Sequence, residues 1–183
     1  MGRSFLRQIL AETLGCRPQD VPIEYDGAGK PQLPSGSGWH FNLSHSEEWA
    51  LIGLTQLGPI GVDIEKVRDG FAVEPIAQRF FSPPEVADLL TLPAEQRLLA
   101  FFRCWTRKEA FIKAIGLGLA YPLDEFDVTL LPGDPPAIRS VKGDPAAGAG
   151  WGMYEVPSPP GFVGALVTPT PHARLVVFDH EDI

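Results

Sequence analysis

The spacing of apolar and polar residues predicts a chain of short helices and strands. Apolar positions recur at helical intervals over residues 2–14, which end before Gly15, and over 101–118. Two further helical stretches lie between residues 73 and 99, separated by a Ser-Pro-Pro break in which Ser82 is a candidate N-cap with Glu85 three residues later. Strands are expected at 21–25, 39–43, 49–55, 60–65, 126–130, 138–141, 151–156, 162–168 and 175–178, and loops at 132–136 and 143–150. This order predicts an α+β fold with two related halves.

The helix expected at 101–118 carries charges on its apolar side. At about 100° per residue, Lys108 and Glu109 fall inside the arc of large apolar side chains, and Lys113 lies at its border. A buried charge is costly unless it is paired or coordinates a metal. The two charges therefore indicate either a functional site or an ordinary feature, such as an internal ion pair or a lysine that extends to solvent.

The segment IGVDIE at 60–65 alternates with the period of a strand. Asp63 and Glu65 share one face, and the apolar residues share the other. One interpretation is an edge strand with a solvated acidic face. The other is a pair of carboxylates held close enough to bind one cation.

Composition and charge exclude several classes of protein. The chain has 183 residues and a formal net charge of −8, which argues against a nucleic-acid-binding protein because such a protein needs a basic surface. No apolar run approaches the ~18 residues of a membrane span. The two cysteines form no disulfide framework, and the first residues lack the pattern of a signal peptide, so we expect a cytoplasmic protein.

The polar residues single out a chemistry. The carboxylates of Asp63, Glu65 and Glu109 are the hard oxygen ligands that Mg²⁺ prefers, whereas the His and Cys residues lack the spacing of a zinc site. Donors for a phosphorylated ligand come from the same elements: Lys30, His45, Lys108 and Lys113. The residues alone thus predict Mg²⁺-dependent chemistry on a phosphate compound.

Four motifs in this order carry a resemblance to a known family: GKP at 29–31, FNLSHS at 41–46, IGVDIE at 60–65 and WTRKEAFIK at 105–113. They resemble the 4′-phosphopantetheinyl transferases, specifically the monomeric, two-lobed type that serves peptide and polyketide synthases. RFFSPPE at 79–85 and LGLAYPLDEFDV at 117–128 are also similar to that family. The resemblance covers about residues 5–131.

The resemblance implies an activity and a role for each site residue. The 4′-phosphopantetheine group of coenzyme A would pass to a serine of an apo acyl or peptidyl carrier protein, releasing 3′,5′-ADP. Asp63, Glu65 and Glu109 would hold Mg²⁺, or Mn²⁺, on the pyrophosphate, and Glu109 would also accept the proton of the serine. Lys113 would stabilise the leaving diphosphate with help from Lys108. The remaining coenzyme A contacts would be Lys30 and Pro31 at the nucleotide end, and Ser44 and His45 on phosphate.

The resemblance also implies an architecture. We expect two pseudo-symmetric lobes, each a small antiparallel sheet packed on a long helix, with the active site between them. The N-terminal lobe would span residues 1–65 and supply Asp63 and Glu65, and the C-terminal lobe would span 66–183 and supply Glu109. The protein would act as a monomer. Trp105 would pack beneath the site, and Phe71, Phe80 and Phe81 are candidate contacts for the carrier.

One departure from the family concerns the start of the chain. Members of this type usually have several dozen residues before the first helix, including basic side chains that grip the 3′-phosphate, whereas this chain begins almost at that helix. We therefore expect a shortened N-terminal lobe and weaker coenzyme A binding. Two alternatives remain open: a non-catalytic module that binds coenzyme A or a carrier protein, and a generic Mg²⁺ phosphohydrolase.

Overall fold

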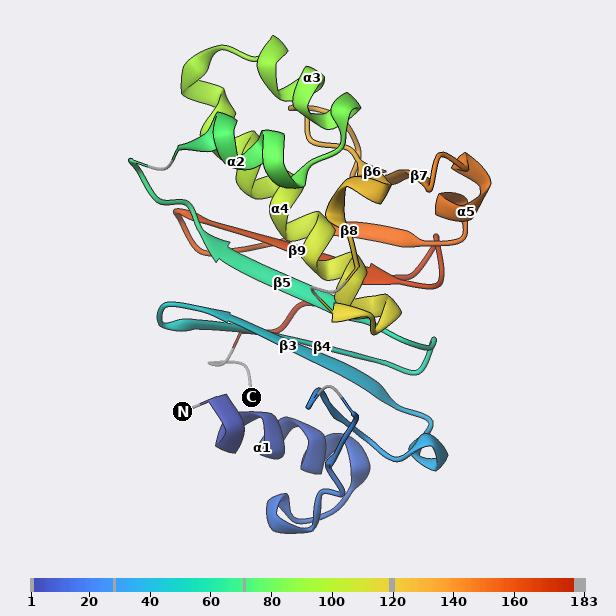
Figure 1. Cartoon of the computed structure of the whole chain (residues 1–183). Helices are drawn as coiled ribbons and strands as arrows, with labels where there is room; N and C mark the ends of the chain where they lie inside the picture. The colour runs from blue at the N-terminus through green and yellow to red at the C-terminus, as the bar shows by residue number, and fades with distance from the viewer. Residues whose placement is uncertain (1, 28, 71, 119–120, 180–183) are drawn as a thin grey trace.

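The fold is α+β, with helices packed on small antiparallel sheets (Figure 1). The computed structural model describes residues 2–27, 29–70, 72–118 and 121–179. In chain order its helices and strands are α1 (Gly2–Leu14), β1 (Glu24–Tyr25), β2 (Pro31–Gln32), β3 (His40–Ser46), β4 (Trp49–Thr55), β5 (Gly61–Lys66), α2 (Val73–Phe80), α3 (Pro83–Thr91), α4 (Ala94–Ile115), β6 (Phe126–Val128), β7 (Ile138–Val141), α5 (Pro145–Ala149), β8 (Gly152–Val156) and β9 (Phe162–Thr168). The predicted α+β class is confirmed.

The N-terminal half consists of α1 packed against the β3–β4 hairpin. The helical spacing of Leu6 and Leu10 puts both side chains on one face of α1, where they are buried against Phe41 of β3. Strands β1 and β2 form a separate two-stranded ladder at the side of this core. Because alternate side chains of a strand point to opposite faces, Phe41 and Leu43 face α1 while Asn42 and Ser44 point to the other side of the hairpin.

The C-terminal half consists of a three-stranded antiparallel sheet, in the order β5-β9-β8, covered by α4. Gly61 at the start of β5 permits this close packing, because a Cβ atom there would overlap the main chain of α4 at Ala110 and Ala114. The core between helix and sheet is built from large apolar side chains, including Phe101, Phe111, Ile112, Val163 and Val167.

Strand β5 lies between the two halves. Figure 1 shows, from bottom to top, α1, the β3–β4 hairpin, β5 and α4, and both β3 and α4 contact β5. Strand β5 is an edge strand of the β5-β9-β8 sheet, as one interpretation predicted. Residues 61–64 are nevertheless buried, because both faces of the strand are covered, so the solvated acidic face of that interpretation is wrong. Strand β5 carries Asp63 and Glu65, pairs with β9 of the C-terminal sheet and also contacts β3 of the first half. The lobe boundary after residue 65 stays a prediction.

The two halves are alike in their layers and unlike in size. One has a two-stranded hairpin on a helix of 13 residues, and the other has a three-stranded sheet on a helix of 22 residues. None of the helices in the described part of the chain is long and apolar enough to span a bilayer.

Several predicted elements have different bounds in the structure. Helix α4 begins at Ala94, seven residues earlier than expected, so the second helical stretch before it ends at Thr91. Ser44, His45 and Ser46 belong to β3 rather than to the hairpin connection, which is only Glu47 and Glu48. Residues 175–178 lie outside the strands and expose Val176, Val177 and Phe178, and the expected loop at 143–150 contains α5. In each case the outcome depends on a packing or pairing partner that local patterns do not reveal.

The cap of α3 was predicted correctly, whereas α4 ends at Ile115 and not at residue 118. Ser82 caps α3 by accepting a hydrogen bond from the main chain of Glu85, whose side chain accepts one in return from the main chain of Ser82. Gly116 ends α4 with a φ of 74°, in the left-handed region that favours glycine.

Candidate active site

Side chains of β3, rather than its main chain, join this strand to β5. The side-chain oxygen of Asn42 accepts a hydrogen bond from the Val62 amide at 2.9 Å. Two residues further on, the Ser44 hydroxyl accepts from the Ile64 amide at 3.4 Å, and the Ser46 hydroxyl accepts from the Lys66 amide at 3.1 Å. These residues form a polar seam between the halves, which we call the β3–β5 seam.

The two carboxylates of β5 are held at this seam. The Ser44 hydroxyl donates to Oδ1 of Asp63 at 2.8 Å, and the Ser46 hydroxyl donates to Oε2 of Glu65 at 2.9 Å. Asp63 is only 4% exposed, and Glu65 is partly buried. The strand therefore presents two oriented carboxylates where the two halves meet.

Helix α4 brings Glu109 and Lys113 to the same place. These residues are four positions apart on one helix face, so their side chains are neighbours. The ammonium of Lys113 donates to Oδ1 of Asp63 at 2.6 Å, to the Ser44 hydroxyl at 3.1 Å and to the Val62 carbonyl at 3.2 Å. A lysine from the C-terminal helix is thus bonded to both sides of the β3–β5 seam.

The electrostatics of the cluster favour a bound cation. Burial, together with the nearby carboxylates of Asp63 and Glu65, raises the pKa of Glu109 to about 7, although Lys113 acts in the opposite direction. Burial also raises the pKa of Asp63, although Lys113 and Ser44 stabilise its ionised form. The negative charge of the three carboxylates therefore exceeds what one lysine compensates.

Two carboxylate oxygens at this site lack hydrogen-bond partners in the described part of the chain. They are Oδ2 of Asp63 and Oε1 of Glu109, and both atoms are buried. A buried carboxylate oxygen without a donor is costly, and a hard cation would satisfy it. Within the described residues no three acidic, His or Cys side chains already converge as a formed metal site. The residues fit Mg²⁺ by chemistry and by their unsatisfied oxygens, and the assignment of Asp63, Glu65 and Glu109 as its ligands stays a prediction.

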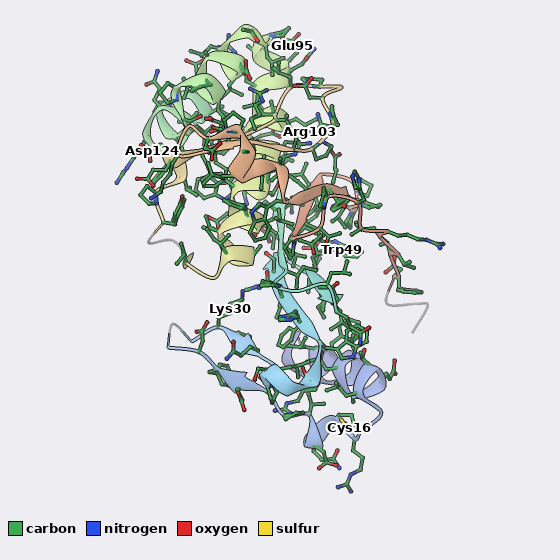
Figure 2. The ribbon with its side chains drawn as sticks, turned by 90° about the vertical axis from the view of Figure 1, so that its right-hand side faces the viewer. Cys16, Lys30, Trp49, Glu95, Arg103 and Asp124 are labelled. Atoms are coloured by element: carbon green, nitrogen blue, oxygen red, sulfur yellow. The ribbon has the colours of Figure 1, made fainter. Side chains whose placement is uncertain are left out.

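Lys30 reaches the site from the N-terminal half. Its ammonium donates to the main-chain carbonyl of Lys113 at 2.6 Å, in the last turn of α4. Figure 2 shows Lys30 at the level where the two halves meet. Burial lowers the pKa of Lys30, with a smaller effect in the same direction from Lys113. The adjacent Pro31 pairs with Tyr25 in the β1–β2 ladder.

Lys108 does not belong to the site, which contradicts its predicted role in phosphate binding. Its side chain is fully buried and forms an ion pair with Glu85 at 2.7 Å. Its other hydrogen bonds go to the carbonyls of Leu123 and Phe126, both at 2.6 Å. An ammonium has three N–H donors, so none is left for a phosphate. The alternative of an internal ion pair is correct for Lys108, with Glu85 as the partner.

The structure also separates Ser44 from His45. The Ser44 hydroxyl donates to Asp63, and its predicted contact with a phosphate stays a prediction. His45 is exposed and lies on the opposite face of β3, the face towards α1. Its contact with a phosphate stays a prediction.

Two residues of this region were not singled out for these roles by sequence reasoning. Ser46 was seen only as part of a polar connection, although its two-residue spacing from Ser44 matches the spacing of Glu65 from Asp63. Glu85 was recognised as a helix-capping residue, but it also accepts from the Val128 amide at 2.7 Å and pairs with Lys108. The spacing could have indicated Ser46; the pairing of Glu85 required the tertiary fold.

The aromatic residues near α4 are mostly core. Phe81 is 3% exposed and stacks on Phe101, which contradicts its role as a carrier contact. Phe80 is partly buried against Trp105, and Trp105 also stacks on Phe101 at the core. The expected place of Trp105 beneath the site stays a prediction. Phe71 lies outside the described residues. A carrier contact by Phe80 stays a prediction.

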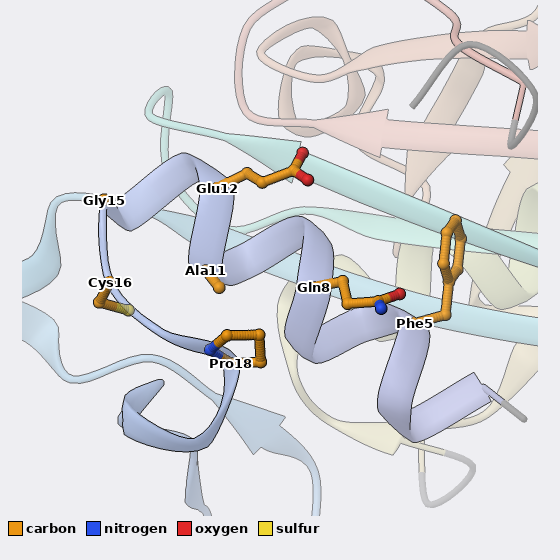
Figure 3. A pocket seen from close by; sticks show the side chains of 7 residues that line it. All are labelled: Phe5, Gln8, Ala11, Glu12, Gly15, Cys16 and Pro18. Carbon is orange, nitrogen blue, oxygen red and sulfur yellow. The ribbon is translucent and has the colours of Figure 1, made fainter.

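Two cavities of the described chain are not lined by these carboxylates. The larger, of about 700 Å³, lies beside α1 and is lined by residues that include Phe5, Glu12 and Cys16 (Figure 3). A second, of about 360 Å³, lies at the turn between β8 and β9. We therefore place the candidate site by its polar cluster and not by cavity size.

Comparisons with known proteins identify the family. The family model of the 4′-phosphopantetheinyl transferase superfamily matches residues 59–152. The chain is 42% identical over 142 residues to the 4′-phosphopantetheinyl transferase HetI of Nostoc, covering 76% of this chain and 60% of HetI. It is 37% identical over 130 residues to the 4′-phosphopantetheinyl transferase Sfp of Bacillus subtilis, covering 71% of this chain and 57% of Sfp. The protein belongs to the 4′-phosphopantetheinyl transferase superfamily, as its motifs predicted.

This chain spans between half and two thirds of the length of the curated relatives named above. Among solved structures, the holo-(acyl-carrier-protein) synthase of Bacillus anthracis in complex with coenzyme A matches with a TM-score of 0.48 and 18% identity, over 60% of this chain and 92% of that chain. The holo-[acyl-carrier-protein] synthase of Thermotoga maritima matches with a TM-score of 0.46 and 24% identity, over 60% of this chain and 61% of that chain.

Proposed function

We propose that this protein transfers the 4′-phosphopantetheine group of coenzyme A to a serine of an apo acyl or peptidyl carrier protein and releases 3′,5′-ADP. Family membership supports this proposal. The observation that carries it is the cluster of Asp63, Glu109 and Lys113 between β5 and α4, with two buried carboxylate oxygens that lack partners. The protein would act as a monomer, because one chain supplies the whole cluster. It would act in the cytoplasm.

The carboxylates would hold the cation and, through it, the pyrophosphate. Asp63, Glu65 and Glu109 would bind Mg²⁺, for which Mn²⁺ could substitute, through the oxygens that the serines and Lys113 leave free. When bound, the ion neutralises charge on the pyrophosphate and makes its phosphorus a better electrophile. Asp63 is the most buried of the three, so it would contribute most to the rigidity of the site.

Glu109 would act as the base. A general base works best when its pKa lies near the working pH, and in the metal-free protein burial and the neighbouring carboxylates raise the pKa of Glu109 to about 7. Its carboxylate would accept the proton of the carrier serine, directly or through water, while the serine oxygen forms a bond to the β-phosphorus. The bond from that phosphorus to the bridging oxygen breaks, and the electron pair leaves with 3′,5′-ADP.

The lysines would assist the leaving group. Lys113 lies beside Asp63 and would stabilise the negative charge of the departing diphosphate as an ammonium donor. Lys30 and Pro31 would line the nucleotide end of coenzyme A, and His45 would contact a phosphate.

Mass measurement of a carrier protein tests this function. The protein is incubated with coenzyme A, Mg²⁺ and an apo carrier, and the proposal expects the carrier to gain the mass of phosphopantetheine. Glu109→Gln should lower the rate at least 100-fold, whereas Glu95→Gln, an exposed position on the same helix, should retain it. Binding of coenzyme A without mass gain would favour the non-catalytic module, and hydrolysis of coenzyme A without transfer would favour a phosphohydrolase.

A further inference from the structure

The β3–β5 seam contains a repeated unit of one serine and one carboxylate. Ser44 accepts from the amide 20 positions later and donates to the carboxylate 19 positions later. Ser46 does the same with the amide of Lys66 and the carboxylate of Glu65, again 20 and 19 positions later. Both serines are buried, with 6% and 5% of their surface exposed. The unit occurs at the two β5 residues that carry carboxylates.

The two bonds of each serine define where its proton points. A hydroxyl has one proton, and the β5 amide occupies one of its lone pairs, so the proton is directed away from that amide and towards the carboxylate. The bond engages one oxygen of each carboxylate, Oδ1 of Asp63 and Oε2 of Glu65. For Asp63 the other oxygen, Oδ2, is the buried atom without a partner in the described chain. At Asp63, Ser44 and Lys113 both donate to Oδ1 and so leave Oδ2 available.

Asn42 provides an internal comparison. It occupies the preceding inward position of β3 and accepts from the Val62 amide in the same way, but its neighbour on β5 carries no carboxylate. Like the serines it is buried, with 6% of its surface exposed. Asn42 thus joins β3 to β5 without touching a predicted metal ligand. A substitution at Asn42 therefore tests the effect of joining the strands separately from the effect of orienting the carboxylates.

We infer that Ser44 and Ser46 are positioning residues that orient Asp63 and Glu65 to bind a divalent cation. This inference rests on the proposed function and assigns to the serines a task beyond holding β3 to β5. Partners that orient metal ligands typically change metal affinity by 10–100-fold when they are removed. Ser46 is the sharper test, because Ser44 also accepts a hydrogen bond from Lys113.

Mn²⁺ binding tests the inference without reference to turnover. Free Mn²⁺ is followed by its electron paramagnetic resonance signal while the full chain is titrated in the presence of coenzyme A. Ser46→Ala should raise the dissociation constant about 10-fold or more, and Ser46→Thr, which keeps the hydroxyl, should restore it to within about threefold of the wild-type value. Asn42→Ala should lower the melting temperature at least as much as Ser46→Ala does and change Mn²⁺ affinity less than about twofold.

Two outcomes would overturn the inference. The first is Mn²⁺ binding by Ser46→Ala equal to that of the wild type. The second is an equal loss of Mn²⁺ affinity in Asn42→Ala, which would mean that joining the strands suffices. Either result, obtained with a wild type that modifies a carrier, leaves the proposed function intact. A wild type that binds Mn²⁺ without modifying a carrier would instead overturn the function, and the variants would still decide the role of the serines.

Discussion

The ammonium of Lys30 donates a hydrogen bond to the main-chain carbonyl of Lys113, and the two atoms are 2.6 Å apart. These residues are 83 positions apart in the chain and come from different halves of the molecule. The carbonyl belongs to the last turn of α4, where main-chain oxygens lack helical partners and a positive charge interacts favourably with the helix dipole. Lys30 therefore links the GKP loop to the helix that carries Glu109 and Lys113.

This link predicts that Lys30→Met destabilises the protein and weakens coenzyme A binding. Loss of a partly buried charged hydrogen bond should lower the free energy of unfolding by about 1–2 kcal/mol. Urea unfolding and calorimetric titration with coenzyme A would measure the two effects. Lys142→Met, at an exposed lysine, is the control and should change the free energy of unfolding by less than about 0.5 kcal/mol. A Lys30→Met protein as stable as this control would contradict the predicted link.

The raised pKa of Glu109 predicts how the stability of the metal-free protein changes with pH. The pKa of Glu109 is about 7 in the folded protein, against an ordinary value of 4.5, so the folded state keeps this proton to higher pH than the unfolded state. The favourable contribution is complete below about pH 4.5 and is lost as the pH rises through about 7. Because the side chain is partly exposed, we expect a loss of about 1–2 kcal/mol rather than the full value of the shift.

Comparison with Glu109→Gln isolates this effect. Urea unfolding in the presence of a chelator at pH 5 and at pH 8 should show that the substitution stabilises the protein more at pH 8 than at pH 5. An equal difference between the two proteins at both pH values would show that Glu109 has an ordinary pKa.

The buried pair of Lys108 and Glu85 predicts a structural rather than a catalytic defect. Lys108→Met leaves the Glu85 carboxylate buried without its partner, which should destabilise the fold by about 3–5 kcal/mol. Turnover per folded molecule should stay within about threefold of the wild type, because the ammonium has no donor to offer a phosphate. Rate measurements normalised to the folded fraction would test this. A 100-fold loss of turnover in fully folded Lys108→Met protein would restore the phosphate role.

The close contact of β5 with α4 predicts that Gly61→Ala disturbs the site. The added Cβ would overlap the main chain at Ala110 and Ala114, so the strand or the helix must move and Asp63 would shift relative to Glu109. We expect a loss of about 2–4 kcal/mol in the free energy of unfolding and at least a 10-fold loss of transfer. Thermal unfolding and the carrier mass assay would measure both quantities.

Gly36→Ala is the control for this prediction. A Cβ at Gly36 would meet open space, so the substitution should leave stability and transfer close to wild type. Normal stability of Gly61→Ala would show that β5 and α4 tolerate a wider separation than the structure has.

The sequence by itself determined the local elements and the candidate residues. Periodicity predicted α1, β7 and β9 with their observed bounds, and the Ser-Pro-Pro break predicted Ser82 as the cap of α3. These features depend on neighbours in the chain, so a single sequence contains their cause. Motif order predicted the family, and charges in an apolar helix face drew attention to Glu109.

Tertiary structure alone decided which charges meet. Lys108 and Glu109 are adjacent in the chain and fall inside the same broad arc of α4, yet Lys108 pairs with Glu85 of α3 and Glu109 lies near the carboxylates of β5. Strand β5 pairs with β9, so Asp63 belongs to the C-terminal sheet. The packing of β3 against β5 places Ser44 and Ser46 opposite the carboxylates. Local patterns specify which face of an element is apolar. The partner of a buried polar group comes instead from the element that packs against it, which can be distant in sequence. A buried polar group is costly without a partner, so the donor or charge that this element carries decides how the group is paired.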